Sequence, residues 1–326
     1  GSIIKLEQNY RSTSHILDAA NAVISNNDER MGKNLWTDTG SGELIDLYNA
    51  QSDRDEARSI TQDILTLTRS ALSSSLKYRD IAVLYRNNSQ SRLIEQYLIA
   101  NSIPYRIYGG LRFFDRAEVK DVTAYLRVMS NPDDTSVMRV INHPPRGIGA
   151  TSLERALESA RASGRTLWET ISACGEDKAL SRTQNFTALI ARMREACEGL
   201  ALADTIKVVI EMSGLQAYYE AQKDKDIRLE NLGEIVNAAS GYYEDNDIDE
   251  NAPAFDVLEG GAMTPLEGFL SQAVLEADDK NEGSEQPDAV QLMTVHASKG
   301  LEFHHVYLIG VEEGIFPHSA RPDEDE

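Results

Sequence analysis

The stretch of sequence that decides the fold is Val290-Gln-Leu-Met-Thr-Val-His-Ala-Ser-Lys-Gly-Leu-Glu-Phe303. Its apolar beginning predicts a buried strand over 290–294, and the residues that follow place Thr, His, Ser, Lys and Gly in one short turn. Hydroxyl, imidazole and backbone N–H groups in such a turn suit contact with a phosphodiester backbone. A lone histidine at a strand end is more often structural, so that alternative stays open for His296.

Further strands are expected upstream and downstream of this stretch. Ile81-Ala-Val-Leu-Tyr85 is a short continuous apolar run after charged residues, which is typical of a strand buried on both faces. A helix is expected from about 89 to 101, followed by a short strand over 105–108, and another strand over 306–309. Strand, helix and strand in that order predict an α/β layer with a parallel sheet.

The segment before this layer is expected to be mixed. An apolar stripe from Ile16 to Ile24 predicts a helix that Ser12, Thr13 or Ser14 caps and that Asn26-Asn27 ends. A strand is expected over 44–48 and a helix over 55–69.

The middle of the chain is expected to be helical, with no strand. The segments that favour helix are 118–130, 137–142, 152–163, 167–173, 181–199, 203–213, 215–223 and 227–243, and acidic loops are expected over 245–261 and 277–288. The predicted fold class is therefore α/β. A parallel-sheet domain formed by residues 1–108 and 289–326 is interrupted by an all-helical insertion over 109–288.

The composition excludes some classes of protein. The longest apolar runs are about five residues, far short of the roughly 20 that span a membrane, and the chain starts with no signal-peptide pattern. The two cysteines, Cys174 and Cys197, read as reduced thiols of a cytoplasmic protein. A net charge of −21 argues against nonspecific DNA binding, yet eight Lys or Arg stand against four acids between Lys77 and Lys120. A local basic surface is thus compatible with the negative net charge of the whole chain.

Three further segments carry candidate sites. Tyr10 and Arg11 precede the first helix, where an aromatic ring can stack on a purine and a guanidinium can contact a phosphate. Arg86 and Asn88 follow the strand over 81–85, at the end where α/β sheets bind ligands. The alternatives are a surface Arg beside a half-buried Tyr in the first case, and a helix cap by Asn88 or Ser89 in the second.

Pro144-Pro-Arg-Gly-Ile-Gly149 stands before a helix expected to start at Thr151 or Ser152. Two glycines let a backbone approach a ligand closely, and a helix N-terminus adds positive potential, so duplex phosphate is the obvious candidate. A plain turn between helices is the more common outcome. Gly314-Ile-Phe-Pro-His318 has a similar alternative, a proline turn with a surface histidine.

Taken together, these strings resemble the motifs of one family. T-x-H-x-x-K-G-L-E-F at Thr294 resembles motif V of the UvrD/PcrA/Rep group of superfamily 1 DNA helicases. L-E-Q-N-Y-R-S at Leu6 resembles motif IV, and Y-R-x-N-x-Q-S-R at Tyr85 resembles motif IVa. The strings occur in the family's order, so the resemblance implies a RecA-like domain (2A) interrupted by a helical domain (2B).

The resemblance implies roles for individual residues. Tyr10 would stack on adenine, Arg11 would be the catalytic arginine at the ATP γ-phosphate, and Glu302 would hydrogen-bond the ribose. The residues implied to contact single-stranded DNA are Arg86, Asn88, Thr294, His296, Lys299 and His318. Those implied to contact duplex DNA are Arg146, Gly147, Ile148 and Gly149, together with Arg112 and Lys120.

The implied function is that of an ATP-dependent 3′→5′ DNA helicase of bacterial DNA repair, with ATP and Mg²⁺ as cofactors and single-stranded DNA and single-strand/duplex junctions as substrates. No G-x-x-x-x-G-K-[ST] occurs in the chain. We therefore expect a 2A/2B fragment, inactive alone, that binds the missing domain 1A of the same protein and repair proteins, with no membrane contact and a location in the cytoplasm at the nucleoid. The metal ligands would lie in the missing domain. The alternative is a non-catalytic acidic protein-interaction module.

Overall fold

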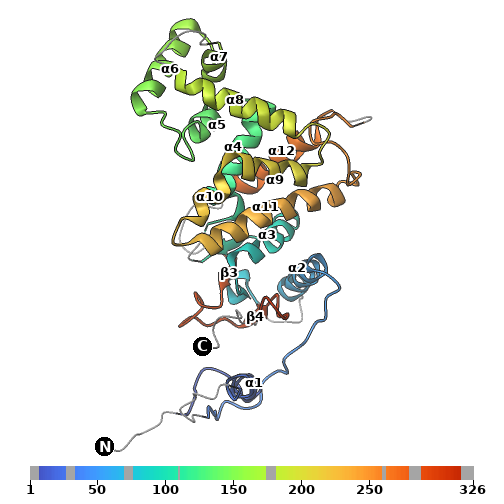
Figure 1. Cartoon of the computed structure of the whole chain (residues 1–326). Coiled ribbons are helices and arrows are strands. Elements are labelled where there is room, and N and C mark those ends of the chain that lie inside the picture. Colours follow the sequence, from blue (N-terminus) through green and yellow to red (C-terminus); the bar gives the residue numbers. More distant parts are fainter. Residues whose placement is uncertain are drawn as a thin grey trace, which may run out of the picture. The chain divides into compact units, whose positions relative to one another are not determined.

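The computed structural model of the protein describes residues 7–26, 34–69, 76–108, 111–173, 181–258, 262–278 and 288–316 (Figure 1). The chain divides into two compact units, Gly1–Ser52 and Asp53–Glu326, and each has its own internal structure.

The first unit contains the predicted N-terminal helix. This helix, α1, runs from Ser14 to Ile24 with Thr13 at its N-cap, and its buried side chain is Leu17. The loops beside it are joined by an isolated parallel bridge between Gln8 and Trp36. The side-chain amide of Asn21 donates to Leu35 O over 2.8 Å and accepts from Leu35 N over 3.1 Å.

The prediction of a strand over residues 44–48 was wrong. These residues form no strand, and Leu44 and Leu47 are 75% and 93% exposed. A strand needs a neighbouring strand to receive its backbone hydrogen bonds. Within the described residues of the first unit, the Gln8–Trp36 bridge is the only such pairing, so the apolar residues of 44–48 have no sheet to join.

The second unit is built on a four-stranded sheet in which every pair is parallel. The strands are β1 (Ile81–Tyr85), β2 (Tyr105–Ile107), β3 (Val290–Thr294) and β4 (His305–Leu308). Their order is β2-β3-β1-β4, so β3 lies between two strands that precede it by about two hundred residues of sequence. This confirms the predicted α/β class with a parallel, RecA-like sheet.

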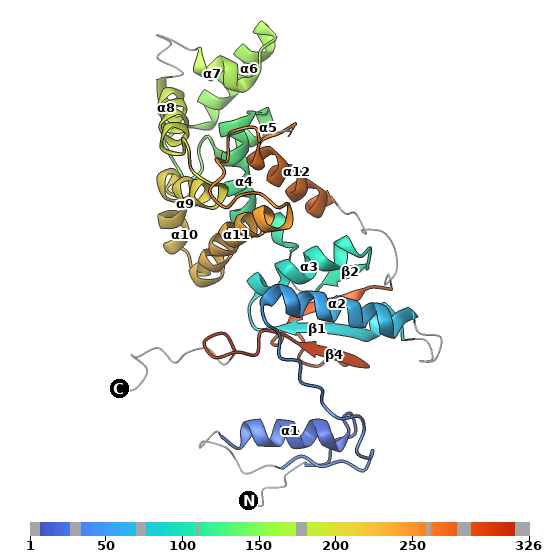
Figure 2. The same cartoon turned by 90° about the vertical axis from the view of Figure 1, so that its right-hand side faces the viewer.

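Two helices cover the sheet and form a core with it. They are α2 (Asp53–Arg69) and α3 (Ser91–Ala100), which pack side by side (Figure 2). Ile64 of α2 and Leu98 of α3 are fully buried with Val83 and Leu292 of the strands. Strand β1 is buried on both of its sides, which explains its continuous apolar run in the sequence.

Between β2 and β3, the described residues form helices joined by turns and loops, and no strand. The helices are α4 (Ala117–Ser130), α5 (Asp134–Val140), α6 (Ala150–Ser163), α7 (Leu167–Ser172), α8 (Ser181–Ala196), α9 (Leu202–Ser213), α10 (Leu215–Glu220), α11 (Lys225–Asp245) and α12 (Pro265–Asp278). Three short 3₁₀ turns, η1 (Tyr78–Asp80), η2 (Asn88–Gln90) and η3 (Phe113–Asp115), precede β1, α3 and α4 respectively.

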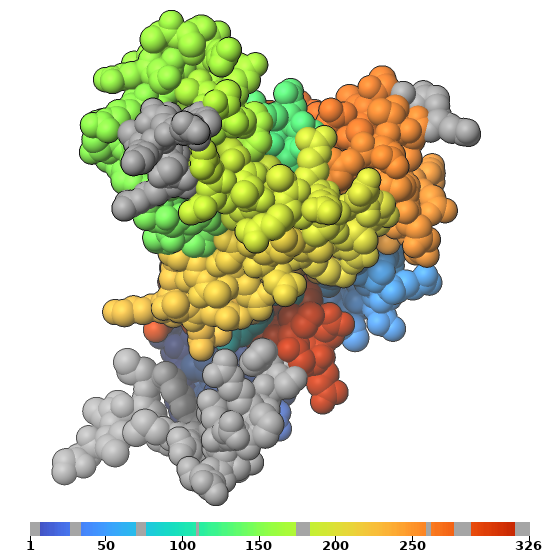
Figure 3. Space-filling view, turned by 45° about the horizontal axis from the view of Figure 1, so that its top comes forward, coloured from blue at the N-terminus to red at the C-terminus, as the bar shows by residue number. Residues whose placement is uncertain are grey.

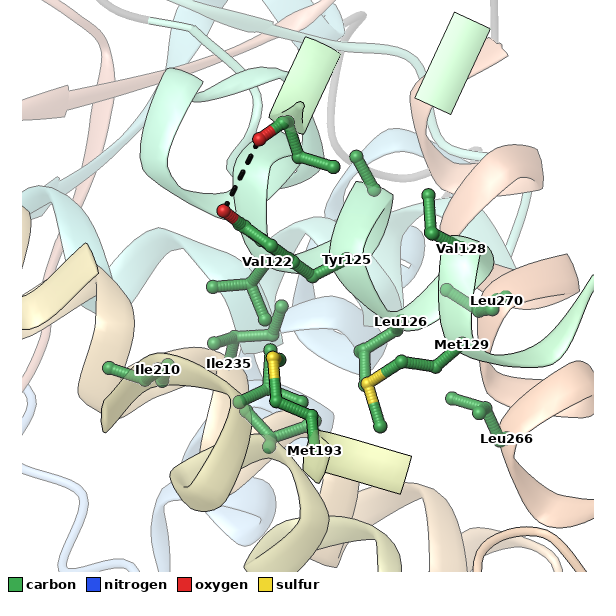
Figure 4. Packing of buried hydrophobic residues seen from close by; sticks show 14 of the residues in the cluster. Val122, Tyr125, Leu126, Val128, Met129, Met193, Ile210, Ile235, Leu266 and Leu270 are labelled. Carbon is green, nitrogen blue, oxygen red and sulfur yellow. Dashed lines mark hydrogen bonds between the residues drawn. The ribbon is translucent and has the colours of Figure 1, made fainter. Parts of the chain in front are cut away.

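A second, separate core holds these helices together. Helix α4 lies at its centre, with Tyr125, Leu126 and Met129 packed against Met193 of α8 and Leu266 of α12 (Figure 4). Helices α9 and α11 pack against each other and form a continuous surface, yellow in Figure 3. The buried thiol of Cys197 belongs to this core, and burial raises its pKa to about 11. The presence of two separate cores agrees with a helical layer inserted into the sheet domain. The predicted domain boundaries stay a prediction.

Two helices differ from the sequence-based expectation. Helix α5 begins at Asp134 instead of Val137, because the Asp133 side chain accepts from Ser136 N over 2.9 Å and caps it. Helix α12 was not predicted, although its buried residues Leu266, Phe269, Leu270 and Ala273 have helical spacing. Within the described residues, no helix is long and apolar enough to cross a membrane.

Candidate nucleic-acid and nucleotide interface

The carboxyl ends of β1 and β3 bring together residues that are far apart in sequence. Tyr85 pairs with Thr294 in the parallel register, so the segments after both strands leave the sheet at the same edge. Arg86 and His296 meet there, and Arg86 Nη1 lies 3.4 Å from His296 Nδ1. Because a guanidinium can only donate, His296 Nδ1 is the acceptor in this contact.

The turn after β3 is held by its own side chains. Thr294 Oγ1 accepts from Ala297 N over 3.2 Å, and Ser298 Oγ donates to Val295 O over 2.8 Å. Gly300 adopts a φ of +89°. The Thr294 hydroxyl therefore forms a hydrogen bond within the turn. The side chains of His296 and Lys299 are exposed at the outer surface of the turn.

The turn after β1 is shaped by Gln90 and Ser91, which belong to the Y-R-x-N-x-Q-S-R string but had no role of their own in the sequence analysis. The side-chain oxygen of Gln90 accepts from Arg86 N over 3.0 Å and from Asn87 N over 2.9 Å. Ser91 Oγ lies 2.9 Å from Asn88 O. Helix α3 starts at Ser91 with Gln90 at its N-cap, so neither Asn88 nor Ser89 caps it.

A buried arginine lies under this turn. Arg116 is 7% exposed, and its Nη2 donates to Asn88 O over 3.0 Å and to Ser91 Oγ over 2.9 Å. Its Nη1 donates to Asn231 Oδ1 of α11 over 2.7 Å. Burial lowers the pKa of this guanidinium, which the neighbouring carboxylate of Glu95 opposes. Sequence reasoning gave no role to Arg116, because a charged residue near a helix start normally faces solvent.

Glu95 is the acidic partner in this buried cluster. It accepts from Ser91 Oγ over 2.5 Å and from Phe113 N over 3.2 Å, and it lies 3.9 Å from Arg116 Nη2. Burial raises the pKa of Glu95 to about 7, and the hydrogen bond from Ser91 and the charge of Arg116 only partly oppose this.

The loop of Arg146, Gly147, Ile148 and Gly149 ends at the start of α6. The guanidinium of Arg146 forms hydrogen bonds within the protein. Its Nη1 donates to Val140 O over 3.1 Å and to Pro144 O over 2.9 Å. Its Nη2 donates to Tyr125 Oη over 2.6 Å and to Ser213 O over 2.7 Å. The guanidinium also lies 5.7 Å from the ring centroid of Tyr125. The side chain of Arg146 is thus committed to fixing the loop.

The other residues of this loop face different surroundings. Ile148 is buried, and its N donates to Asn142 Oδ1 over 3.2 Å. Gly147 and Gly149 are exposed, and a Cβ added at either would meet no atom within 4 Å. The two glycines therefore leave the backbone open to a large ligand, with the N-terminus of the 14-residue helix α6 directly after them.

Two further cations from the sequence analysis lie apart from that loop. The Arg112 guanidinium lies 5.2 Å from the ring centroid of Tyr105. Lys120 Nζ forms an ion pair with Asp115 Oδ1 over 2.6 Å while its side chain stays 43% exposed. Nothing in these contacts identifies a ligand.

In the first unit, Tyr10 and Arg11 occupy a turn before α1. Asn9 Oδ1 accepts from Arg11 N and from Ser12 N, each over 2.9 Å, which fixes the turn as an Asx motif. The Tyr10 side chain is 81% exposed. Glu302, in the second unit, is also exposed. His318 lies outside the described residues. The roles of Tyr10, Arg11 and Glu302 in ATP binding stay predictions.

Fold and site define a class: an α/β protein with a RecA-like parallel sheet, an inserted helical layer, and a polar edge at the carboxyl ends of the strands. Residues 4–326 match the model of the UvrD-like helicase C-terminal domain, and the chain belongs to that family.

Individual relatives agree with this assignment. The chain is 43% identical to DNA helicase II of Escherichia coli strain K12 over 98% of its own length, and 40% identical to the ATP-dependent DNA helicase PcrA of Leuconostoc citreum over 99%. It is 38% identical to the PcrA of Bacillus subtilis strain 168 over 98%. The chain spans 42–43% of the length of these relatives.

Proposed function

We propose that this chain is the DNA-guiding half of an ATP-dependent 3′→5′ DNA helicase, with single-stranded DNA crossing the edge of the sheet at Arg86 and His296. The observation that carries the proposal is the meeting of these two side chains at the ends of β1 and β3. Asn88, Thr294 and Lys299 belong to the same two turns. A guanidinium, an ammonium group and an imidazole on these two turns suit contact with the phosphates of one strand.

Duplex DNA would be held by the loop before α6. Backbone N–H groups at a helix start, with two exposed glycines beside them, form a surface that suits a phosphate backbone. Arg146 would act through this loop as a positioning residue, and Arg112 and Lys120 would add long-range attraction. Single strand and duplex would then contact different layers of the second unit.

ATP is the proposed ligand of the three residues to which the resemblance assigned it. Tyr10 offers an open ring for stacking on the base, Arg11 a guanidinium for the γ-phosphate, and Glu302 a carboxylate for the ribose hydroxyls. When bound, ATP supplies the free energy of phosphoryl transfer to water. Mg²⁺ would be held by carboxylates outside this chain, and among the described residues no cluster of three His, Cys, Asp or Glu could hold a metal ion.

We further propose that the 326-residue chain hydrolyses no ATP alone, because its sequence contains no G-x-x-x-x-G-K-[ST] for the phosphates. Robust, DNA-stimulated turnover from a pure sample would refute this. A role in DNA repair, repair proteins as partners and a nucleoid location in the cytoplasm stay predictions.

A fluorescence titration tests DNA binding. Labelled single-stranded and tailed duplex DNA should bind the chain at low salt, and Arg86→Ala and His296→Ala should weaken single-strand binding. The alternative, an acidic protein-interaction module, expects no DNA affinity at low salt and no effect of either substitution. The two outcomes therefore separate the two functions.

A further inference from the structure

Helix α11 of the helical layer reaches across to the segment that carries the candidate single-strand contacts. Three of its residues, Glu230, Asn231 and Glu234, form polar contacts there. Glu230 Oε1 accepts from Asn87 Nδ2 over 3.1 Å, and Glu234 Oε1 accepts from Arg92 Nε over 2.5 Å. In Figures 1 and 2, α11 lies next to α3, which agrees with these contacts.

The third contact runs through Arg116. One edge of its guanidinium reaches Asn231 of α11, while Nη2 holds Asn88 O and Ser91 Oγ. A guanidinium is planar and rigid, so its donors keep a fixed mutual geometry. A shift of α11 therefore displaces the backbone of Asn88 or breaks one of these bonds.

The chemistry of these contacts suits them to fixing the position of α11 relative to the turn, and they are expected to add little to the free energy of unfolding. Arg92 and Arg116 are only 6% and 7% exposed. Buried ion pairs contribute little net stability compared with apolar packing of the same volume, because both charges lose their water. Removing one partner, however, leaves a buried charge without compensation. Such contacts are well suited to fixing one arrangement of two layers.

We infer that Arg116, Asn231 and Glu234 are positioning residues: through them, helix α11 holds the Arg86–Asn88 turn in the geometry that contacts single-stranded DNA. The inference rests on the proposed function. It predicts that single-strand affinity depends on residues of the helical layer that touch no DNA.

The main test uses the whole chain and a fluorescein-labelled oligo(dT) at low salt, with Glu234→Ala as the central variant. We expect its affinity to fall on the order of tenfold, within the range of couplings between contacting residues. Glu234→Gln keeps an acceptor for Arg92 and should restore most of the affinity. Glu211→Ala is the matched control, since it removes an exposed glutamate from α9.

A double-mutant cycle separates positioning from a general loss of stability. In an Arg86→Ala background, Glu234→Ala should have almost no further effect, because the contact that it positions is already gone. Additive effects, or wild-type affinity in a folded Glu234→Ala protein, would overturn the inference. Should Glu234→Ala not fold, Glu230→Ala takes its place in the cycle, since Glu230 is the residue of α11 that accepts from Asn87 Nδ2 of the turn.

Hydrogen exchange distinguishes a failure of this inference from a failure of the proposed function. Without DNA, the amides of residues 86–91 should exchange faster in Glu234→Ala than in the wild type or in Glu211→Ala. A wild-type chain that binds no DNA overturns the proposed function and the functional half of the inference. Unchanged exchange in Glu234→Ala overturns the claim that α11 holds the turn.

Discussion

Arg86 and His296 are 210 residues apart in the sequence, yet Arg86 Nη1 lies 3.4 Å from His296 Nδ1. The contact exists because β1 and β3 are adjacent parallel strands that end at the same level. The helical layer is inserted between β2 and β3 in the sequence, so the site forms only when the chain returns to the sheet after that insertion.

The first prediction concerns Arg86. Arg86→Ala should weaken binding to single-stranded DNA several-fold and lower the salt dependence of log K by about 0.7, the loss of one phosphate contact to a single strand. Arg106→Ala is the matched control, because Arg106 is an exposed arginine on β2. Titrations at several salt concentrations measure both quantities. Equal slopes for Arg86→Ala and the wild type would contradict a phosphate contact.

The second prediction concerns Glu95 and pH. Its pKa is raised to about 7 in the folded protein, from an ordinary value of 4.5, so between these pH values the folded state holds a proton that the unfolded state has lost. The free energy of unfolding should therefore fall as pH rises from about 4.5 to 7, by at most about 3 kcal/mol. Chemical denaturation at pH 5, 6, 7 and 8 measures this trend.

Glu95→Gln is the control for that trend. Glutamine keeps an oxygen that can accept from Phe113 N but carries no titratable group. The variant should lose the Glu95 component of the pH dependence, and its advantage over the wild type should grow from pH 5 to pH 8. An unchanged pH profile in Glu95→Gln would show that other groups cause the trend.

The parts of the fold that could be predicted are those where a single local pattern decides the structure. The apolar runs of β1 and β3 indicate strands buried on both faces, and polar residues directly after them indicate the ligand edge. The strand expected over 44–48 is absent because a short apolar segment after a turn does not show whether a partner strand exists. Helix α12 was overlooked within an acidic region, although its apolar spacing is helical.

The candidate site likewise contains residues that the sequence could predict and residues that it could not. Arg86 and His296 could be predicted because motif residues after neighbouring strands meet at one edge. Arg116 and Asn231 could not, because buried polar networks depend on contacts between distant helices. Arg146 looks like a phosphate contact in the sequence, and only the coordinates show that its guanidinium bonds Val140 O, Pro144 O and Ser213 O.

The third prediction follows from those bonds. Arg146→Ala should lower the free energy of unfolding by about 2–3 kcal/mol, because it removes charged donors from several carbonyls and from Tyr125. Its duplex affinity should fall only through the disordering of the loop, so the salt slope for duplex DNA should stay unchanged. A variant of normal stability with a reduced salt slope would instead identify Arg146 as a phosphate contact.

The fourth prediction compares the two glycines of the same loop. Gly147 has a φ of +74°, so Gly147→Ala should cost about 1 kcal/mol of stability in strain. Gly149 is the N-cap of α6 with extended backbone, where serine is a favoured residue, so Gly149→Ser should leave stability unchanged. If the backbone of this loop approaches duplex phosphates, the added side chain should still weaken binding to tailed duplex several-fold.

Single-stranded DNA is the control substrate for Gly149→Ser, since the loop lies in the helical layer and Arg86 at the sheet edge. Affinity for an oligo(dT) should equal that of the wild type, and urea denaturation should confirm equal stability. Equal losses for single strand and tailed duplex would mean that the loop does not discriminate between them. No loss for either DNA would exclude close approach of duplex to Gly149, because a side chain there has room only where no ligand sits.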